Sequence, residues 1–383
     1  MSGKILIVSV FFIIITGGCK KAAPVQYFSE PDSFDKVFQN FWIKMNTNYV
    51  YWDIDATNWN SVYTKYKPIF SKLDIQNSND LRKSVSYFRE MTGSLLDNHY
   101  YISFQNSYMA DSSIYPAFAR KSKMSSFHYP FSYFKTDTSY LDKKYILAFD
   151  NLNAVNGVPL TVLTGTIQQN ILFFSFNHCS LFKSFNSANG NVKSALQFFF
   201  EQLSAQTVKG VIVDVRSNQG GDIADLNFLV GRFIDSQLHF GFTKSKSGTA
   251  QFQYTPWIKA FVSASEQGKK ISVPIIVLTD NVTASTAEAI TMALHCLPKT
   301  VTIGETTWGA TGPVTSEELY NDGSFSIPGF LSVQTASCQF KYIDNKIYEE
   351  TGFPPDIPIA FNYISLLNNK DVQLEKAISL LQY

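Results

Sequence analysis

The sequence has few of the residues that build disulfide scaffolds or metal sites. Its 383 residues include 4 cysteines and 5 histidines, and neither C-x-x-C nor H-E-x-x-H occurs. The cysteines that follow Cys19 are odd in number and widely separated, so they do not describe a set of disulfides. A zinc peptidase has no support, because its paired helical histidines are missing. We therefore expect neither a metal nor another cofactor.

Net charge is also scarce. The chain has 32 basic and 31 acidic residues and so offers no electrostatic reason to bind nucleic acid. G-x-G-x-x-G and G-x-S-x-G are absent, and S-x-x-K occurs at 33–36 and 180–183 without its companion motifs. The 45% hydrophobic composition is that of a globular protein with one large core or two to three domains.

The longest hydrophobic run lies at the N-terminus. The apolar stretch from 5 to 15 is too short to span a bilayer and fits the hydrophobic region of a signal peptide. Small residues at 16–18 precede Cys19, which resembles a bacterial lipobox. We expect a signal peptide over 1–18, a tether over 19–30, and lipidation of Cys19. An ordinary secretory signal with an incidental cysteine is the alternative, and both interpretations imply export.

The residue after Cys19 indicates which bacterial membrane would retain the lipoprotein. Lys20 occupies the second mature position, and aspartate there commonly retains lipoproteins at the inner membrane. We therefore expect a lipid anchor in a bacterial membrane, the outer membrane in particular.

Two different patterns occupy residues 31–165. Apolar and aromatic residues recur at spacings of three and four in 34–45, 59–66 and 81–95, which predicts a helical N-terminal domain over 31–104. Residues 105–165 are aromatic and hairpin-like, with a turn signal at Asn156-Gly157, and predict a small β-rich segment. The stretch 155–159 faintly resembles the tail of a PDZ domain, so a degenerate PDZ-like remnant is a further interpretation.

From residue 166 to 383, apolar strands and amphipathic helices alternate. Strands are expected at 171–176, 210–215, 275–278 and 301–303, and helices at 192–203, 222–234 and 289–294. This alternation predicts an α/β domain with right-handed crossovers.

One serine lies at the start of the helix in a predicted strand-turn-helix unit. The segment 280–288 follows the apolar strand at 275–278 and precedes a buried helix, so Ser285 falls in the first helical turn. Backbone N–H groups are unpaired there and could stabilise an oxyanion formed after attack by the serine. Ser285-x-x-Glu288 is equally a capping box, so this segment alone leaves both interpretations open.

Two further segments carry candidate groups. Arg216 to Gly221 leaves the carboxyl end of a buried strand, and Gly220 and Gly221 let N–H groups approach a reacting atom closely, although a plain tight turn is the alternative. Among the histidines, His99 closes the third helical stretch with Asp97 beside it. His239 and His295 lie in apolar contexts that favour packing roles.

Four motifs occur in order along the chain: L-x-D-x-H at 95–99, R-x-N-x-G-G at 216–221, T-A-S-x-A-E at 283–288 and E-x-x-G-x-x-P-D at 349–356. Together they resemble the serine peptidase family of the C-terminal processing proteases, the tricorn core and the interphotoreceptor retinoid-binding protein, over roughly residues 30–360. The resemblance implies an α/β fold with a crotonase-like ββα catalytic core.

The resemblance also implies site residues. Ser285 matches the nucleophile, and the N–H groups of Thr286 and of Gly220 or Gly221 match the oxyanion hole. The processing proteases use a lysine base, but Ala310 stands at that position.

The tricorn-like branch uses a histidine base steadied by a glutamate, and His99 and Glu349 match those positions. Asn98 stands where the tricorn core has a serine that helps hold the base. The implied protein is a serine endopeptidase for peptide or protein substrates. A catalytically silent relative that binds peptides or hydrophobic ligands in the same cleft is one alternative. A carbohydrate-binding surface lipoprotein, suggested by aromatic content alone, is another.

Overall fold

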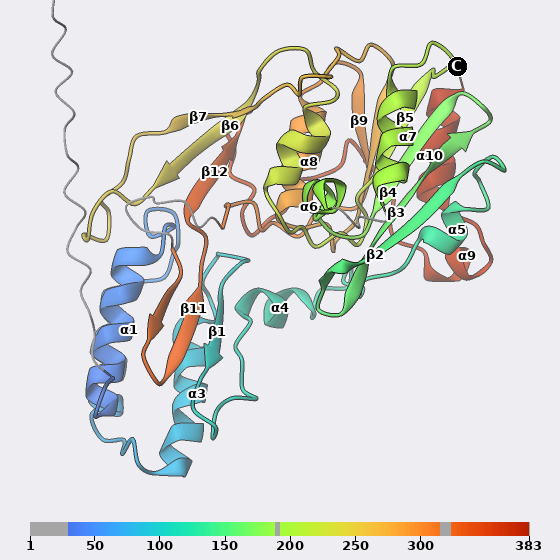
Figure 1. Ribbon diagram of the computed structural model, residues 1–383. Coiled ribbons are helices and arrows are strands. Elements are labelled where there is room, and N and C mark those ends of the chain that lie inside the picture. Colours follow the sequence, from blue (N-terminus) through green and yellow to red (C-terminus); the bar gives the residue numbers. More distant parts are fainter. Residues whose placement is uncertain (1–29, 188–191, 315–322, 383) are drawn as a thin grey trace, which may run out of the picture.

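The fold is that of a computed structural model, which describes residues 30–187, 192–314 and 323–382. The expected signal peptide and Cys19 lie outside the described residues. Figure 1 shows an α/β part at one end of the molecule and the helices α1 and α3 at the other. Within the described ranges, no helix combines the length and apolarity needed to cross a membrane.

A seven-stranded mixed sheet forms the centre of the α/β part, in the order β13-β9-β8-β5-β4-β3-β2. The strands from β13 to β4 are parallel, and β3 and β2 extend the sheet antiparallel. The strands are β2 Ile146–Val155, β3 Val158–Ile167, β4 Ile171–Phe176, β5 Gly210–Asp214, β8 Ile275–Thr279, β9 Thr300–Gly304 and β13 Ile357–Pro358. The predicted α/β class is thereby confirmed.

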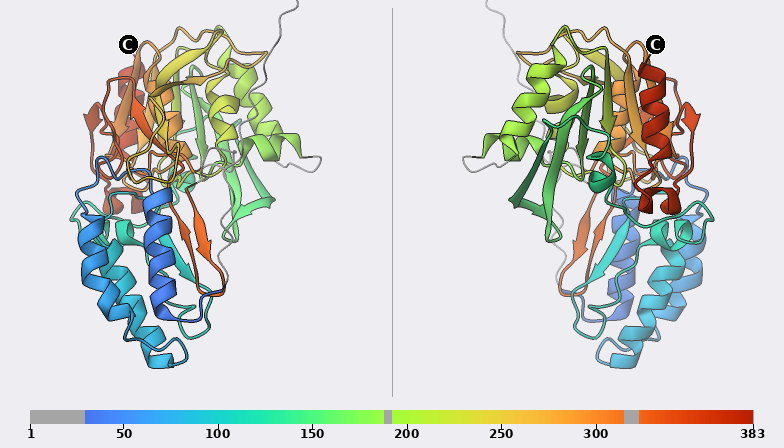
Figure 2. Two further views of the ribbon diagram at one scale, coloured as in Figure 1. Left: turned by 90° about the vertical axis from the view of Figure 1, so that its left-hand side faces the viewer. Right: turned by 90° about the vertical axis from the view of Figure 1, so that its right-hand side faces the viewer.

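Alternate residues of β5 face opposite layers. Val211 and Val213 pack in one cluster with α7 (Lys193–Leu203) and α8 (Thr286–His295), whereas Ile212 packs in another with α10 (Val372–Leu381). Figure 2 shows α7 and α10 on opposite sides of the sheet. Because both faces are covered, the central strands are continuous apolar runs rather than alternating ones.

The N-terminal part combines helices with a small sheet. The helices α1 (Phe34–Asn48), α2 (Trp59–Phe70) and α3 (Ser78–Thr92) share a core with the antiparallel sheet β1-β11-β10. These strands are β1 Tyr101–Phe104, β10 Phe325–Ile327 and β11 Leu331–Gln334. The expectation of helix up to residue 104 was therefore wrong at its end. The partner strand β11 lies more than two hundred positions away, so local periodicity could not reveal the pairing.

A third sheet, β12-β6-β7, lies beside α8 and reaches toward α1 (Figure 1). It is antiparallel and consists of β6 Leu238–Ser245, β7 Ile258–Val262 and β12 Cys338–Tyr342. The short elements are α4 Pro116–Lys121, α5 Phe134–Asp137, α6 Leu181–Asn186, the π-helical turn η1 Leu226–Val230 and α9 Tyr363–Leu367. The helix expected over 222–234 is thus shorter. A Cβ on Gly231 would lie 2.7 Å from the carbonyl oxygen of Ser263, so the helix ends where another backbone segment crosses it.

The expected boundary between residues 165 and 166 falls inside β3. Since β2 and β3 pair with each other and β3 pairs with β4, residues 146–167 belong to the seven-stranded sheet. The segment over 105–165 is therefore not β-rich throughout, because its first half holds α4 and α5. The division of the chain into domains remains a prediction.

Candidate active site

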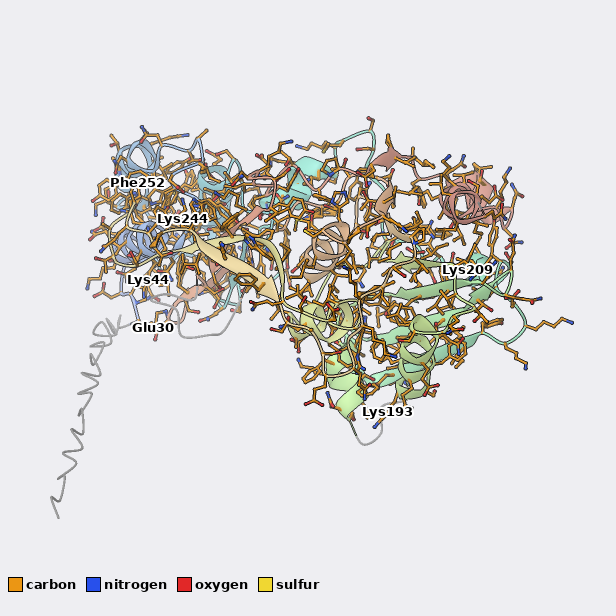
Figure 3. The ribbon with its side chains drawn as sticks, turned by 90° about the horizontal axis from the view of Figure 1, so that it is seen from above. Glu30, Lys44, Lys193, Lys209, Lys244 and Phe252 are labelled. Carbon is orange, nitrogen blue, oxygen red and sulfur yellow. The ribbon has the colours of Figure 1, made fainter. Side chains whose placement is uncertain are left out.

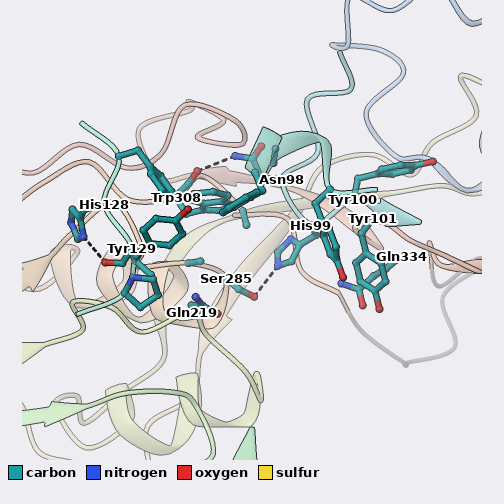
Figure 4. Close-up of a pocket in the computed structure, with 18 residues that line it drawn as sticks. Asn98, His99, Tyr100, Tyr101, His128, Tyr129, Gln219, Ser285, Trp308 and Gln334 are labelled. Atoms are coloured by element: carbon teal, nitrogen blue, oxygen red, sulfur yellow. Dashed lines mark hydrogen bonds between the residues drawn. The ribbon is translucent and has the colours of Figure 1, made fainter. Parts of the chain in front are cut away.

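Ser285 and His99 meet although they are 186 positions apart. The Ser285 Oγ lies 2.9 Å from the His99 Nε2, at hydrogen-bond distance (Figure 4). Ser285 comes from the loop after β8, and His99 comes from the turn between α3 and β1. The expectation that His99 closes the third helix was wrong, because α3 ends at Thr92. A short turn carries the imidazole to the α/β part instead.

Ser285 has a strained backbone. It is the N-cap of α8 with φ 58° and ψ −124°, a conformation that non-glycine residues rarely adopt. Its N–H donates to Glu288 Oε2 at 2.9 Å, which forms one half of the capping box. The Ser285 hydroxyl also faces His99.

Glu288 joins this turn to the loop after β9. Its carboxylate also accepts the N–H of Gly309 at 2.7 Å and of Ala310 at 2.8 Å. Burial raises the pKa of Glu288, and these hydrogen bonds oppose that rise. The sequence places Glu288 in the T-A-S-x-A-E motif and predicts only a capping role for it. Its second set of partners comes from a distant segment.

The glycine loop lies against Ser285. A Cβ on Gly220 would be 2.6 Å from the Ser285 Cβ, so only glycine fits there, and Gly220 has φ 88°. The Gly220 N–H donates to Asn218 Oδ1 at 2.9 Å. In the described ranges, the N–H groups of Gly221 and Thr286 have no recorded protein acceptor. Gly221 and Thr286 therefore offer two free donors beside the hydroxyl.

Asp280 links the glycine loop that follows β5 to the serine loop that follows β8. Its carboxylate accepts the Ser217 N–H at 2.9 Å and the N–H groups of Val282 and Thr283 at 3.0 Å. The Ala284 N–H reaches the Asn218 carbonyl at 2.9 Å. The sequence showed Asp280 at the start of the serine segment, but nothing local indicated that it binds the other loop.

Two buried carboxyl groups flank the imidazole. One oxygen of Asp97, one of Glu349 and one ring nitrogen of His99 all lie within 4.8 Å of one another. Asp97 Oδ1 accepts the His99 backbone N–H at 2.8 Å, and Glu349 Oε1 accepts the Asn98 N–H at 2.8 Å. The His99 Nδ1 is buried and has no hydrogen-bond partner in the structure. Glu349 thus lies near the imidazole without a direct hydrogen bond to it.

The surroundings shift the pKa values of this group. Burial lowers the pKa of His99 below its ordinary value of 6.5, and the negative charge of Asp97 acts against that shift. Burial, followed by the charge of Asp97, raises the pKa of Glu349 to about 8. Glu349 therefore takes up a proton far more readily than an exposed glutamate does.

The same three residues are the candidates for a metal ion, but their geometry does not favour one. Glu349 Oε2 already accepts three hydrogen bonds at 2.8–2.9 Å, from Tyr51 and from the Thr311 and Gly312 N–H groups. The second oxygen of Asp97 accepts the Ala336 N–H at 2.8 Å. Donors therefore occupy several of the lone pairs that a cation would need.

Asn98 and Trp308 connect the imidazole turn to the core. The Asn98 Nδ2 donates to the Trp308 carbonyl at 2.9 Å, and the Trp308 N–H donates to the Thr283 carbonyl at 2.8 Å. The Asn98 side-chain amide therefore links the turn that carries His99 to the serine loop. Sequence reasoning did not single out Trp308 or Tyr51, because their roles depend on contacts far along the chain.

Ser285 and His99 lie where two cavities meet, of about 330 and 270 Å³. Both cavities are also lined by Ala310, at the position where a lysine base would stand. No lysine lines either cavity within the described ranges. Lys121 lies nearby, but its Nζ donates to the Glu350 carbonyl at 2.8 Å. The arrangement therefore pairs the serine with a histidine rather than a lysine.

Comparison with known proteins agrees with this geometry. Residues 181–359 match the profile of peptidase family S41. The chain is 28% identical over 157 residues to the carboxy-terminal processing protease CtpA of Bacillus subtilis (strain 168), covering 41% of this chain and 30% of that protein. It is 25% identical over 180 residues to the nisin-resistance protein of Lactococcus lactis subsp. lactis, covering 45% of this chain and 53% of that protein.

A solved structure shows the same fold over nearly the whole chain. The structure of a candidate peptidase from Parabacteroides merdae ATCC 43184 superposes with a TM-score of 0.70 at 21% identity, covering 92% of this chain and 98% of that one. The chain spans only about a third to a half of the two curated relatives. The matched region nevertheless contains the glycine loop, the serine segment and Glu349, and these matches identify residues 181–359 as a domain of peptidase family S41.

Proposed function

We propose that the protein is a serine endopeptidase with Ser285 as nucleophile, His99 as general base and Glu349 as the carboxyl group that steadies the base. The 2.9 Å contact between the Ser285 hydroxyl and the His99 Nε2 carries the proposal. A serine hydroxyl is a weak nucleophile near neutral pH unless a neighbouring base removes its proton. The lowered pKa of His99 keeps the imidazole neutral, and therefore basic, at neutral pH.

The reaction follows from this placement. As Ser285 Oγ attacks the carbonyl carbon of the scissile bond, its proton moves to His99 Nε2. The oxyanion then accepts hydrogen bonds from the free N–H groups of Gly221 and Thr286, because the Gly220 N–H already donates to Asn218. The imidazolium returns the proton to the departing amine. A water molecule, deprotonated in turn by His99, hydrolyses the acyl-enzyme. Each oxyanion donor contributes on the order of 3 kcal/mol.

Glu349 and Asp97 are assigned complementary tasks. The Asp97 carboxylate accepts the His99 backbone N–H and holds the turn, while Glu349 lies near the ring with its other oxygen fixed by Tyr51. A Glu349 oxygen lies within 4.8 Å of one ring nitrogen of His99, and the His99 Nδ1 has no other hydrogen-bond partner. A carboxylate beside the ring stabilises the imidazolium that forms during attack.

Glu349→Gln is expected to lower kcat by roughly a hundredfold or more while KM changes less than about threefold. The glutamine NH₂ group would face the N–H donors of Thr311 and Gly312, which donate to Glu349 Oε2 in the parent, and the side chain would be displaced from the imidazole. Steady-state kinetics on a peptide measures both constants. Glu350→Gln is the matched control, because Glu350 is adjacent but exposed. Equal losses at the two positions would refute the role given to Glu349.

The function is tested with the purified mature protein. It should hydrolyse casein or a model peptide without added metal and should react with a fluorophosphonate probe, which labels only activated serines. Peptide mapping by mass spectrometry should place the label on Ser285. A protein that binds peptides but neither cleaves them nor takes up the probe would be the catalytically silent relative instead.

We further propose that the α/β part is a crotonase-like core and that the N-terminal helices form a unit that supplies His99. The parallel strands β4, β5 and β8, with α7 and α8 packed on one face, support the first assignment. The separate cores of the helical and α/β parts support the second.

We also propose export and lipidation at Cys19. Support comes from the apolar run and from the small residues before Cys19. Cys19→Ser should release a soluble and fully active protein from the membrane fraction, because two or three acyl chains at about 0.8 kcal/mol per methylene would otherwise hold it there. Mass spectrometry of the mature N-terminus is the check. An unacylated N-terminus at another residue would remove the lipoprotein proposal and leave the peptidase proposal intact.

A further inference from the structure

We infer that the larger cavity beside Ser285 is a subsite for a large aromatic side chain of the substrate, adjacent to the scissile bond. This inference rests on the proposed peptidase function and adds a substrate class to it. The cavity, of about 330 Å³, is called the aromatic cavity below. Its ring-bearing walls are formed by Tyr101, Tyr115, Phe118, Phe127, Tyr129 and Trp308.

Several of these rings are exposed although they are large. Tyr115 is 52% exposed, Phe118 45% and Tyr129 70%. Figure 4 shows Tyr129 and Trp308 on one side of the Ser285–His99 pair and Tyr101 on the other. Scattered exposed rings are ordinary, but rings gathered around one concavity mark a binding site for an apolar group.

The rings are ordered in a way that suits an aromatic guest. Phe127 packs edge-to-face against Phe118, with ring centroids 5.8 Å apart and an interplanar angle of 84°. It packs likewise against Tyr129, at 5.1 Å and 78°. Aromatic pairs favour these tilted arrangements, so a further ring entering the cavity would extend an existing set of favourable contacts.

The wall that carries Phe127 and Tyr129 is fixed to the core. His128 Nε2 lies 2.8 Å from Glu305 Oε2. The His128 ring also stacks on the ring of Phe361, with the ring centroids 3.9 Å apart. The Phe131 N–H donates to Ser217 Oγ at 3.0 Å. Because the walls of this cavity are already ordered, little binding free energy is lost in ordering them when a substrate binds. Differences between substrate side chains should therefore appear as differences in affinity.

The lining offers no charge to a charged side chain. Of the described residues that line the aromatic cavity, none is Asp, Glu, Lys or Arg. Two histidines line the cavity, and both already have partners, since His99 contacts Ser285 and His128 is paired with Glu305. A carboxylate or ammonium group entering here would lose hydration without gaining a partner, which disfavours charged residues at this position.

The neighbouring cavity differs, so the two sides of the scissile bond meet different surroundings. It is lined by Gly221, Ile223, Thr286, Ala289 and the segment 311–314, besides the residues that both cavities share. A peptide passing through both cavities would present a carbonyl carbon to Ser285 at their junction. The aromatic side chain is therefore expected directly beside the bond that is cut.

The test measures kcat/KM for a peptide set that is identical except for Phe, Leu, Ala, Asp or Lys at the two residues flanking the scissile bond. On one side of that bond, Phe should exceed Ala by at least about tenfold and should exceed Asp by more, as apolar pockets discriminate. Mass spectrometry of the products identifies the side. Phe118→Asp should reduce the Phe-to-Ala ratio at least about fivefold, because it places a charge on the wall.

Phe252→Asp is the matched control. Phe252 is 63% exposed and lies at the end of the molecule that holds the N-terminal helices, outside the aromatic cavity (Figure 3). The Phe252→Asp variant should leave the Phe-to-Ala ratio of kcat/KM unchanged. Cleavage without a preference for Phe, or with a preference for a charged residue, overturns the inference and leaves the peptidase proposal standing.

A separate readout covers the case in which no peptide is cleaved. Calorimetry should then show the Phe peptide binding at least about tenfold more tightly than the Ala peptide, with the difference lost in Phe118→Asp. That result would overturn the peptidase proposal and retain the cavity. Equal binding of both peptides would overturn the inference.

Discussion

Ser285→Ala is expected to abolish peptide hydrolysis and fluorophosphonate labelling, with a loss of kcat of roughly a millionfold, as found when a serine nucleophile is removed. The hydroxyl is the atom that attacks, and its contact in the structure is the His99 Nε2 at 2.9 Å. The melting temperature should stay within a few degrees, because little packing is lost. Activity assays, probe labelling and a thermal melt measure the three outcomes.

Two companion variants sharpen this result. Ser272→Ala removes an exposed serine elsewhere and should leave all three readouts unchanged. Ser285→Gly should be inactive but more stable than Ser285→Ala, since glycine adopts φ 58° without the strain of about 1–3 kcal/mol that a side chain incurs. A Ser285→Ala protein that cleaves peptides like the parent would show that the nucleophile is misassigned.

His99→Gln is expected to lower kcat/KM by roughly a thousandfold or more and to remove the acid limb of its pH profile. Because burial holds the pKa of His99 below 6.5, the parent should retain activity somewhat below pH 6.5 and lose it as the imidazole protonates at lower pH. Rates measured across pH 4–9 test this. His239→Gln, in β6, is the matched control and should keep both the rate and the limb.

The same pKa shift has a consequence for stability. The unfolded chain protonates its histidines near pH 6.5, whereas folded His99 resists protonation, so acidification below pH 6.5 should cost stability until the folded pKa is reached. His99→Gln should lose that part of the pH dependence. An active variant with an unchanged acid limb would contradict the role of His99 and reopen the search for a lysine.

Much of the α/β part was predictable because its signals are local. β4 and β8 were expected almost residue for residue, since a short apolar run that ends in a turn describes a buried strand. α8 and the position of Ser285 at its start followed from the same pattern. The predictions failed where the bounds of an element depend on contacts with a segment that is distant in the sequence. β1 pairs with β11, and the helix expected over 222–234 stops at a crossing backbone.

The sequence by itself determined which segments are buried strands, where the serine stands relative to its helix, and which four motifs occur in order. Only the tertiary structure decided that His99 reaches Ser285 and that Glu349 lies near the imidazole without bonding to it. It alone brought the rings of 115–129 and Trp308 together in one cavity. The physical reason is that periodicity reports which face of a segment is covered, whereas a site depends on which distant segment covers it.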